Sequence, residues 1–288
     1  MTTPLTPPPA PPAAPVPPVP QASAAPPRGP SPAGRVIAIL AIVLGAMIVL
    51  GAVFSAVTST IASALVRTDS RSLAVGTVSD LDIDLSAGRF DVVFDAGIRD
   101  AQLEVTSTFG ADSWTFAVEG DTLTVGSPHR LFGPAWWFGG SGRAVLRLPA
   151  SLQGLDAEFD ISAGDVSATG EFGDVDVQLG AGAITLNGTA RQLGLNLSAG
   201  SADVALADVR SAELTVSAGS VTSQFSGAQP QSIVVGVSAG SVDLRVPEGD
   251  YDVRSNVSAG DFDSRIPATR GAASTIDVRI SAGSVSLR

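Results

Sequence analysis

The sequence predicts an all-β protein in which one membrane-spanning helix precedes a parallel β-solenoid. Three observations support this fold class: a short motif recurs at a nearly constant spacing, apolar residues alternate on both sides of it, and one long uncharged stretch lies near the N-terminus. A period near twenty residues is typical of stacked repeats, because one repeat alone cannot bury its apolar side.

The recurring motif is Ser-Ala-Gly, with one Gly-Ala-Gly variant. From Ser162 onward its copies are separated by 18, 18, 19, 21, 20 and 23 residues, and an outlying copy begins at Ser86. Glycine tolerates the backbone angles of a sharp bend and allows neighbouring backbones to approach closely, so we expect the motif glycines at the corners of the coils. These corner glycines are Gly88, Gly164, Gly182, Gly200, Gly219, Gly240, Gly260 and Gly283.

Apolar residues alternate on both sides of the motif. Around Ser238 they are Ile233, Val235, Val237, Val242 and Leu244. Alternation predicts a strand with one buried face, and the apolar positions change parity across the motif, so the chain must bend there. Coils of about 18–23 residues supply the return path that parallel strands need, and the general preference for right-handed crossovers favours a right-handed solenoid. We therefore predict seven solenoid coils within residues 151–288.

A β-sandwich of hairpins is the alternative fold. It predicts turn pairs such as Asn-Gly every 8–12 residues or so. Asn187-Gly188 is the only such pair in the repeat region. The spacing of turn residues therefore favours the solenoid.

The N-terminal part of the chain predicts a tether and an anchor. Residues 1–34 are rich in proline and cannot form a core, so we expect an extended tail. Residues 35–67 contain an uncharged run from Val36 to Val66, long enough for a helix across a hydrocarbon layer of about 30 Å. A cleaved signal peptide is the alternative, but its apolar part would be only about 7–15 residues long. We expect an uncleaved single-pass anchor in the cell membrane, with the N-terminus in the cytoplasm and the C-terminal domain extracellular.

Residues 73–150 predict less regular strands and hairpins that cap the solenoid. Leu81 to Val92 is a full copy of the repeat, and Val118 to Thr122 predicts a hairpin turn. Arg143 to Pro149 predicts a further strand that ends at proline. We expect this region to be continuous with the repeats.

An aromatic insertion, residues 127–142, interrupts this capping region. It holds two of the three tryptophans and the single histidine of the chain. One interpretation is a loop folded back over the open end of the solenoid, and the other is an exposed patch that contacts the lipid interface or a partner. The candidate contact residues are Phe132, Trp136, Trp137 and Phe138.

Composition excludes several classes of function. The formal net charge is −11 and there is no lysine, which argues against a nucleic-acid partner and a phosphate-binding Walker motif. There is no cysteine, and the lone His129 has no local partner that would indicate a catalytic triad. We predict no catalytic residue, no cofactor and no metal site, and hence no enzyme. A polysaccharide-processing enzyme remains an alternative because β-helices can carry such sites.

Two periodic sets of polar residues have alternative interpretations. Aspartates at outward positions, such as Asp82, Asp84, Asp174 and Asp176, could stack into a carboxylate ladder for a hard cation such as calcium, or form a solvated face mixed with arginine. The serine that opens seven of the eight motifs is expected to form a ladder of hydrogen bonds between neighbouring coils.

The units Ser238 to Leu244 and Ser281 to Leu287, together with the Pro-rich tail and the single membrane helix, resemble a bacterial family of membrane-anchored β-solenoid domains of unknown function. These are the "putative adhesin" or toast-rack-like domains. The resemblance implies a cell-surface solenoid with no enzymatic residues to carry over. We therefore expect an adhesin-like module that binds a cell-wall or surface component. The alternative is a sensor or scaffold that assembles with another membrane protein, or with itself, through the open edge of its last strand, Ser284 to Leu287.

Overall fold

A computed structural model describes residues 67–107, 111–128 and 142–288 of the chain. The predicted tail, residues 1–34, and nearly all of the predicted anchor lie outside these residues, as do His129 and the aromatic contact candidates. Within the described ranges, no helix is long and apolar enough to cross a membrane.

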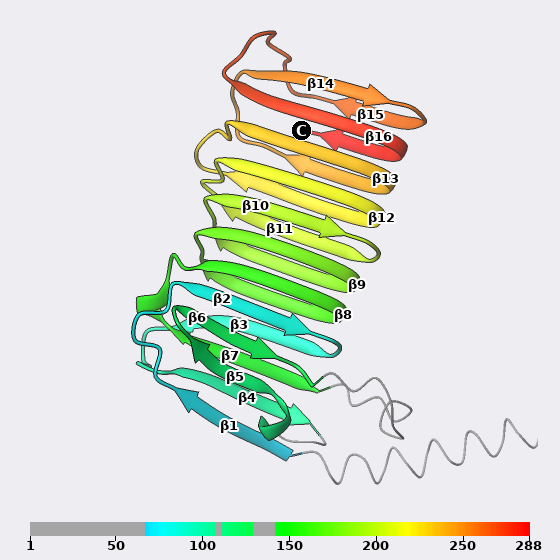
Figure 1. The fold of residues 1–288 in the computed structure, drawn as a ribbon. Helices are drawn as coiled ribbons and strands as arrows, with labels where there is room; N and C mark the ends of the chain where they lie inside the picture. The colour runs from blue at the N-terminus through cyan, green and yellow to red at the C-terminus, as the bar shows by residue number, and fades with distance from the viewer. Residues whose placement is uncertain (1–66, 108–110, 129–141) are drawn as a thin grey trace, which may run out of the picture. The chain divides into compact units, whose positions relative to one another are not determined.

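The described residues form an all-β fold whose sixteen strands belong to one continuous sheet (Figure 1). Two single turns of 3₁₀ helix accompany them, η1 (Ala111–Ser113) and η2 (Ala150–Leu152). The strands are β1 (Arg67–Leu73), β2 (Asp80–Leu85), β3 (Arg89–Asp95), β4 (Ala101–Ser107), β5 (Thr115–Glu119), β6 (Thr122–Gly126), β7 (Arg143–Pro149), β8 (Asp156–Glu171), β9 (Asp174–Thr189), β10 (Gln192–Leu197), β11 (Ser201–Ala207), β12 (Ser211–Ser226), β13 (Ser232–Arg245), β14 (Tyr251–Val257), β15 (Gly260–Ser264) and β16 (Ser274–Leu287).

Each coil has two strand segments, one before and one after its corner. In β8, β9, β12, β13 and β16 a single strand runs through the corner, whereas β2–β3, β10–β11 and β14–β15 are separate pairs. The segments before the corner stack in parallel into what we call the first face, and the segments after it stack into the second face. Apolar side chains from both faces alternate inward and share one core, which confirms a solenoid-like stack of parallel coils.

The corner glycines stack in a column at the bend of every coil. Seven of the eight have φ between 116° and 144°, a region that side chains with a Cβ avoid, and Gly240 is the exception. A Cβ on each glycine would collide with the carbonyl oxygen of the glycine in the adjacent coil, and Gly142 continues the column beyond Gly88. Close backbone stacking therefore requires glycine here. The predicted serine ladder is wrong: the motif serines of β8, β13 and β16 are exposed outside the corner, and no hydrogen bond joins their hydroxyls.

The coils do not stack in chain order at the C-terminal end. β16 lies between β13 and the β14–β15 coil, and it pairs in parallel with both. The chain skips one layer after β13, forms β14–β15 at the end of the stack, and returns through residues 265–273 to insert β16 (Figure 1). The prediction that Ser284 to Leu287 forms the open edge is therefore wrong. The edge belongs to β14 and β15.

Antiparallel strands close the opposite end of the stack. β4 pairs with β7 and β1 pairs with β4, while β5 forms the predicted hairpin with β6. Trp114 and Phe116 are buried there, and Trp114 stacks on Phe90 with ring centroids 6.0 Å apart. Arg71 of β1 donates a hydrogen bond to the Trp114 carbonyl at 3.1 Å. β1 begins before the expected start of this region at residue 73.

Candidate functional site

The outward side of the first face is strongly acidic where β2, β8 and β9 lie side by side. Strand alternation places every second residue outward, and parallel pairing brings equivalent positions into rows across the strands. We call this surface the acidic face. Its carboxylates are Asp80, Asp82, Asp84, Asp156, Glu158, Asp160, Asp174, Asp176 and, from β12, Glu213.

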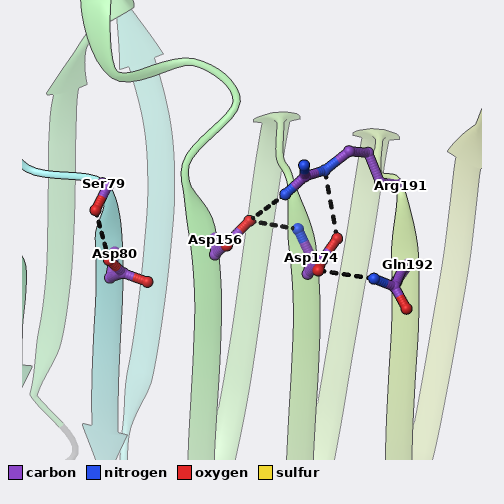
Figure 2. Close-up of polar contacts among 6 residues, drawn as sticks. All are labelled: Ser79, Asp80, Asp156, Asp174, Arg191 and Gln192. Atoms are coloured by element: carbon purple, nitrogen blue, oxygen red, sulfur yellow. Dashed lines mark hydrogen bonds and ion pairs between the residues drawn. The ribbon is translucent and has the colours of Figure 1, made fainter.

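Polar partners largely satisfy the first row of the acidic face (Figure 2). Arg191, in the turn before β10, places Nη2 2.8 Å from Asp156 Oδ1 and Nε 3.3 Å from Asp174 Oδ1. Gln192 donates a hydrogen bond to Asp174 Oδ2 at 2.8 Å, and Ser79 donates one to Asp80 Oδ2 at 2.6 Å. This row is a structural network that ties three neighbouring coils together.

The second row lacks such compensation. Asp82, Glu158 and Asp176 are register neighbours on β2, β8 and β9, and no arginine pairs with any of them among the described residues. Partial burial raises the pKa of Asp82, with the charges of Asp84 and Asp160 as further causes. Burial and neighbouring carboxylates, Asp160 among them, likewise raise the pKa of Glu158 and of Asp176. These groups repel one another, so a positively charged partner would relieve the repulsion.

A shallow groove of about 720 Å³ follows these two rows across the first face. Gly194 continues the second row on β10 between Asp176 and Glu213, and the Asp176 carboxylate lies over it, where a Cβ would collide with Oδ2. A second groove, of about 420 Å³, lies nearer the corner and is lined by Asp84 and Asp160. The acidic face is therefore hollowed along the direction in which the coils stack.

The second face carries charges of both signs. Arg89 contacts Asp165 at 3.1 Å, and Arg143 contacts Asp91 at 2.9 Å. Farther along the stack, Arg288 lies 3.6 Å from Asp243. Asp165, Asp91 and Asp243 of the second face are thus paired with arginine, whereas the row Asp82, Glu158 and Asp176 of the first face is not.

The comparison with known families identifies the fold. The family model described as Toastrack DUF4097 matches residues 78–288, which is most of the chain. The chain belongs to the Toastrack DUF4097 family. The match begins just before β2 and runs to the last residue, so the acidic face and the β14–β15 end of the stack lie within this Toastrack domain, whereas β1 precedes it.

Solved structures that resemble this chain include three bacterial proteins. A protein from Clostridium sporogenes described as a "putative cell adhesion protein" is 10% identical, with a TM-score of 0.36, and covers 77% of this chain and 98% of its own. A "putative adhesin" from Parabacteroides merdae is 10% identical, with a TM-score of 0.39, and covers 77% and 96%. A "putative lipid binding protein" from Parabacteroides distasonis is 14% identical, with a TM-score of 0.32, and covers 77% and 97%. No curated protein matches the sequence.

The described part of the Toastrack domain contains no group of three or more metal-ligating side chains placed to hold a metal ion. The predicted outward aspartates Asp82 and Asp176 lie in one row through Glu158 of β8, and Asp174 lies in the neighbouring row with Asp156 and Asp80. The partners that sequence reasoning missed are Glu158 and Asp160, which could have been found by aligning outward positions of successive repeats.

The ends of the aromatic insertion lie at the corner of the coil that precedes β2–β3 in the stack. The backbone N–H of Ser86 donates to Ser127 Oγ at 2.7 Å. The buried Ser127 directly follows Gly126, the register partner of Asp84, so it lies beside Leu85, and Gly142 occupies the next place in the glycine column. In the sequence, the insertion thus stands between β6 and Gly142, the corner glycine of this coil of the Toastrack domain. Phe132, Trp136, Trp137 and Phe138 themselves lie outside the described residues.

Proposed function

We propose that the protein is a membrane-anchored, extracytoplasmic interaction module that acts in an adhesin-like manner. Its acidic face would bind a positively charged component of the cell envelope. The observation that carries this proposal is the row Asp82, Glu158 and Asp176, which is uncompensated by cations and lies along a groove. Complementary charge supplies specificity and fast association at such a surface.

The arrangement of β1, β4 and β7 supports a position close to the membrane. Arg67, which directly follows the uncharged run of the predicted anchor, pairs in register with Ser107 of β4. Thr106, the neighbour of Ser107, pairs with Arg143, which follows the aromatic insertion. Arg67, after the uncharged run, and Arg143, after the insertion, therefore lie on β1 and β7, the two strands that pair with β4. Tryptophans are favoured at membrane interfaces. We propose that Phe132, Trp136, Trp137 and Phe138 contact the lipid interface there.

Two tests separate localisation from binding. With a different tag at each end of the full chain, protease treatment of intact cells is expected to remove the C-terminal tag and spare the N-terminal one. Protection of the C-terminal tag would reverse the orientation and contradict a role outside the cell.

Binding is tested with a labelled decalysine peptide and the full-length chain in mild detergent. The triple variant Asp82→Asn, Glu158→Gln, Asp176→Asn is expected to weaken binding on the order of tenfold, since each exposed charge contact contributes modestly. The matched control removes three charges from the second face: Asp165→Asn, Asp203→Asn, Asp243→Asn. Equal weakening by both triples would show that only net charge matters, and no binding by the unaltered chain would remove the acidic face from the proposal.

A further inference from the structure

The β14–β15 coil ends the stack with an unpaired edge. Among the described residues, both strands pair only with β16, whereas internal coils pair on two sides. The return segment, residues 265–273, covers the start of β14, at the end of the strand away from the corner. Thr269 donates its backbone N–H to the Tyr251 carbonyl there at 2.8 Å. From Val253 to Val257 and from Gly260 to Ser264, the outer backbone groups have no strand partner. Such an edge is a template for strand addition.

The inward side chains of this coil are also incompletely covered. Val257 is 38% exposed, whereas its register partner Ile280 on β16 is 2% exposed. Phe262 is only partly buried, whereas its partner Val285 is 2% exposed. The end of the stack therefore presents apolar side chains between two rows of unpaired backbone groups. Neither strand contains a proline that would prevent pairing.

The two strands of the edge carry complementary charges. The outward charges of β14 are Arg254 and Asp252, which are 2.8 Å apart, and those of β15 are Asp261 and Asp263. Arg265, directly after β15, lies 3.5 Å from Asp263. Arg254 lies four residues before Ser258, and Asp263 lies four residues after Ala259, so both lie at the same distance from the corner. Asn256 and Asp261 are equivalent in the same way, two residues from the corner. A surface with this symmetry can be complementary to itself.

We infer that the occupant of this edge is a second copy of the same chain, related by a two-fold axis parallel to the strands. This rotation places β14 of each copy beside β15 of the other, in antiparallel orientation. It brings Arg254 beside Asp263 of the second copy and Asn256 beside Asp261 of the second copy, twice in each dimer. The alternative two-fold axis, perpendicular to the strands, would place β14 against β14 and β15 against β15, and so would bring like charges together.

The dimer is expected to be weak. β14 and β15 supply 7 and 5 residues. Their sum of 12 is about half of the 20–30 residues that each partner typically contributes to a stable interface. The first described residues lie in β1, at the opposite end of the stack. Two copies joined in this way would therefore carry their N-terminal strands at the two far ends of the dimer.

Disulfide cross-linking of the full-length chain in mild detergent tests this arrangement, because the chain contains no native cysteine. The double variant Asn256→Cys, Asp261→Cys is expected to form a covalent dimer on oxidation. The two positions lie on opposite faces of one coil, and opposed sheets are about 10 Å apart, too far for a disulfide within one copy. The matched control is Arg279→Cys, Ser284→Cys, which occupies the same register on internal β16 and is expected to remain monomeric.

Adding Asp263→Asn to the cross-linking variant is expected to lower the yield of dimer on the order of fivefold, because two exposed ion pairs per dimer are lost. Asp243→Asn, in the same row on internal β13, is expected to leave the yield unchanged. Thermal unfolding of each variant serves as the control that it remains folded. Equal cross-linking in the Arg279→Cys, Ser284→Cys control, a dimer from Arg254→Cys alone, or no dimer at any protein concentration would each overturn the inference.

Discussion

The coil of β16 and the coil of β14–β15 carry the same corner motif but occupy different places. Ile276, Val278 and Ile280 of β16 are at most 2% exposed, because coils cover them on both sides. Their register partners on β14 are Val253, Ser255 and Val257, and Ser255 and Val257 are exposed. The chemistry of the inward positions, and not the order along the chain, therefore distinguishes the internal coil from the terminal one.

Desolvation explains why the terminal coil tolerates serine. A buried hydroxyl without a partner costs about 1–3 kcal/mol, and Ser255 and Ser264 would both meet this cost in an internal coil. At the end of the stack they stay in contact with water. The connections also allow the exchange: residues 246–250 and 265–273 are longer than the two-residue turns 172–173 and 190–191. Terminal repeats of solenoids are generally more polar for the same reason.

The largest expected effect comes from making the internal coil resemble the terminal one. Val278→Ser removes buried apolar surface and leaves an unpaired hydroxyl, so we expect the free energy of unfolding to fall by about 3 kcal/mol or more. The matched reverse change, Ser255→Val, alters a solvated position and is expected to change it by less than about 0.5 kcal/mol. Thermal and chemical unfolding measure both. Similar effects of the two changes would contradict the coil order.

Ser223 is the exception that sharpens the comparison. It lies at an inward position of internal β12, between Val204 and Leu244, with no exposed surface and no partner for its hydroxyl. Ser223→Ala removes the desolvated hydroxyl and is expected to raise the free energy of unfolding by about 1 kcal/mol. Ser220→Ala, on the exposed side of the same strand, is the control and should have little effect. A loss of stability in Ser223→Ala would indicate that the hydroxyl has a bound partner.

A smaller effect distinguishes the acidic face from the second face through pH. Because the pKa of Asp82, Glu158 and Asp176 is raised on folding, the folded state binds protons more tightly, and stability rises as the pH falls from 7 toward about 5. Glu158→Gln should reduce this rise by a few tenths of a kcal/mol, whereas Asp203→Asn on the second face should not. Unfolding measured across this pH range tests the difference, and equal curves for the two variants would contradict it.

Asp252 of the terminal coil has the opposite pH dependence. Hydrogen bonds from Arg254 at 2.8 Å and from the backbone of Gly271 at 3.2 Å lower its pKa. Its contribution is therefore present above the ordinary aspartate pKa and is lost as the pH falls through the lowered value. Asp252→Asn should make the free energy of unfolding fall less steeply below about pH 4. The part of the curve near neutral pH, its neutral limb, should stay unchanged. A change confined to the neutral limb would contradict the assignment.

The smallest effect on stability is expected from the aromatic insertion. Trp136→Ala with Trp137→Ala is expected to leave thermal unfolding unchanged and to weaken association with lipid vesicles or with cells. The reason is that the residues on either side of the insertion contact the β2–β3 coil: Ser127 Oγ accepts a hydrogen bond from the Ser86 N–H, and Gly142 stacks on Gly88. Matched substitutions at the exposed corner serines Ser217→Ala and Ser238→Ala should change neither quantity. Unchanged association in the tryptophan variant would remove the insertion from the proposed function.

The candidate site was only partly predictable from the sequence. Alternation alone identified Asp82 and Asp176 as outward residues, because the period of a strand is two. It did not show that Arg191 neutralises Asp156 and Asp174 while Glu158 stays unpaired. That difference arises because Arg191, in the turn before β10, contacts the two preceding coils, β8 and β9. A repeat pattern does not encode such a contact.

The sequence by itself determined the class of fold, the inward positions and the corner glycines, because these follow from local constraints: a period of two within strands, a period near twenty between coils, and backbone angles that only glycine readily adopts. The tertiary structure decided which coils are neighbours. Every coil presents nearly the same pattern of hydrogen-bonding groups, so pairing alone does not distinguish one neighbour from another. Loop length and the cost of burying Ser255 and Ser264 placed β16 inside and β14–β15 at the end, and both act only once the coils are stacked.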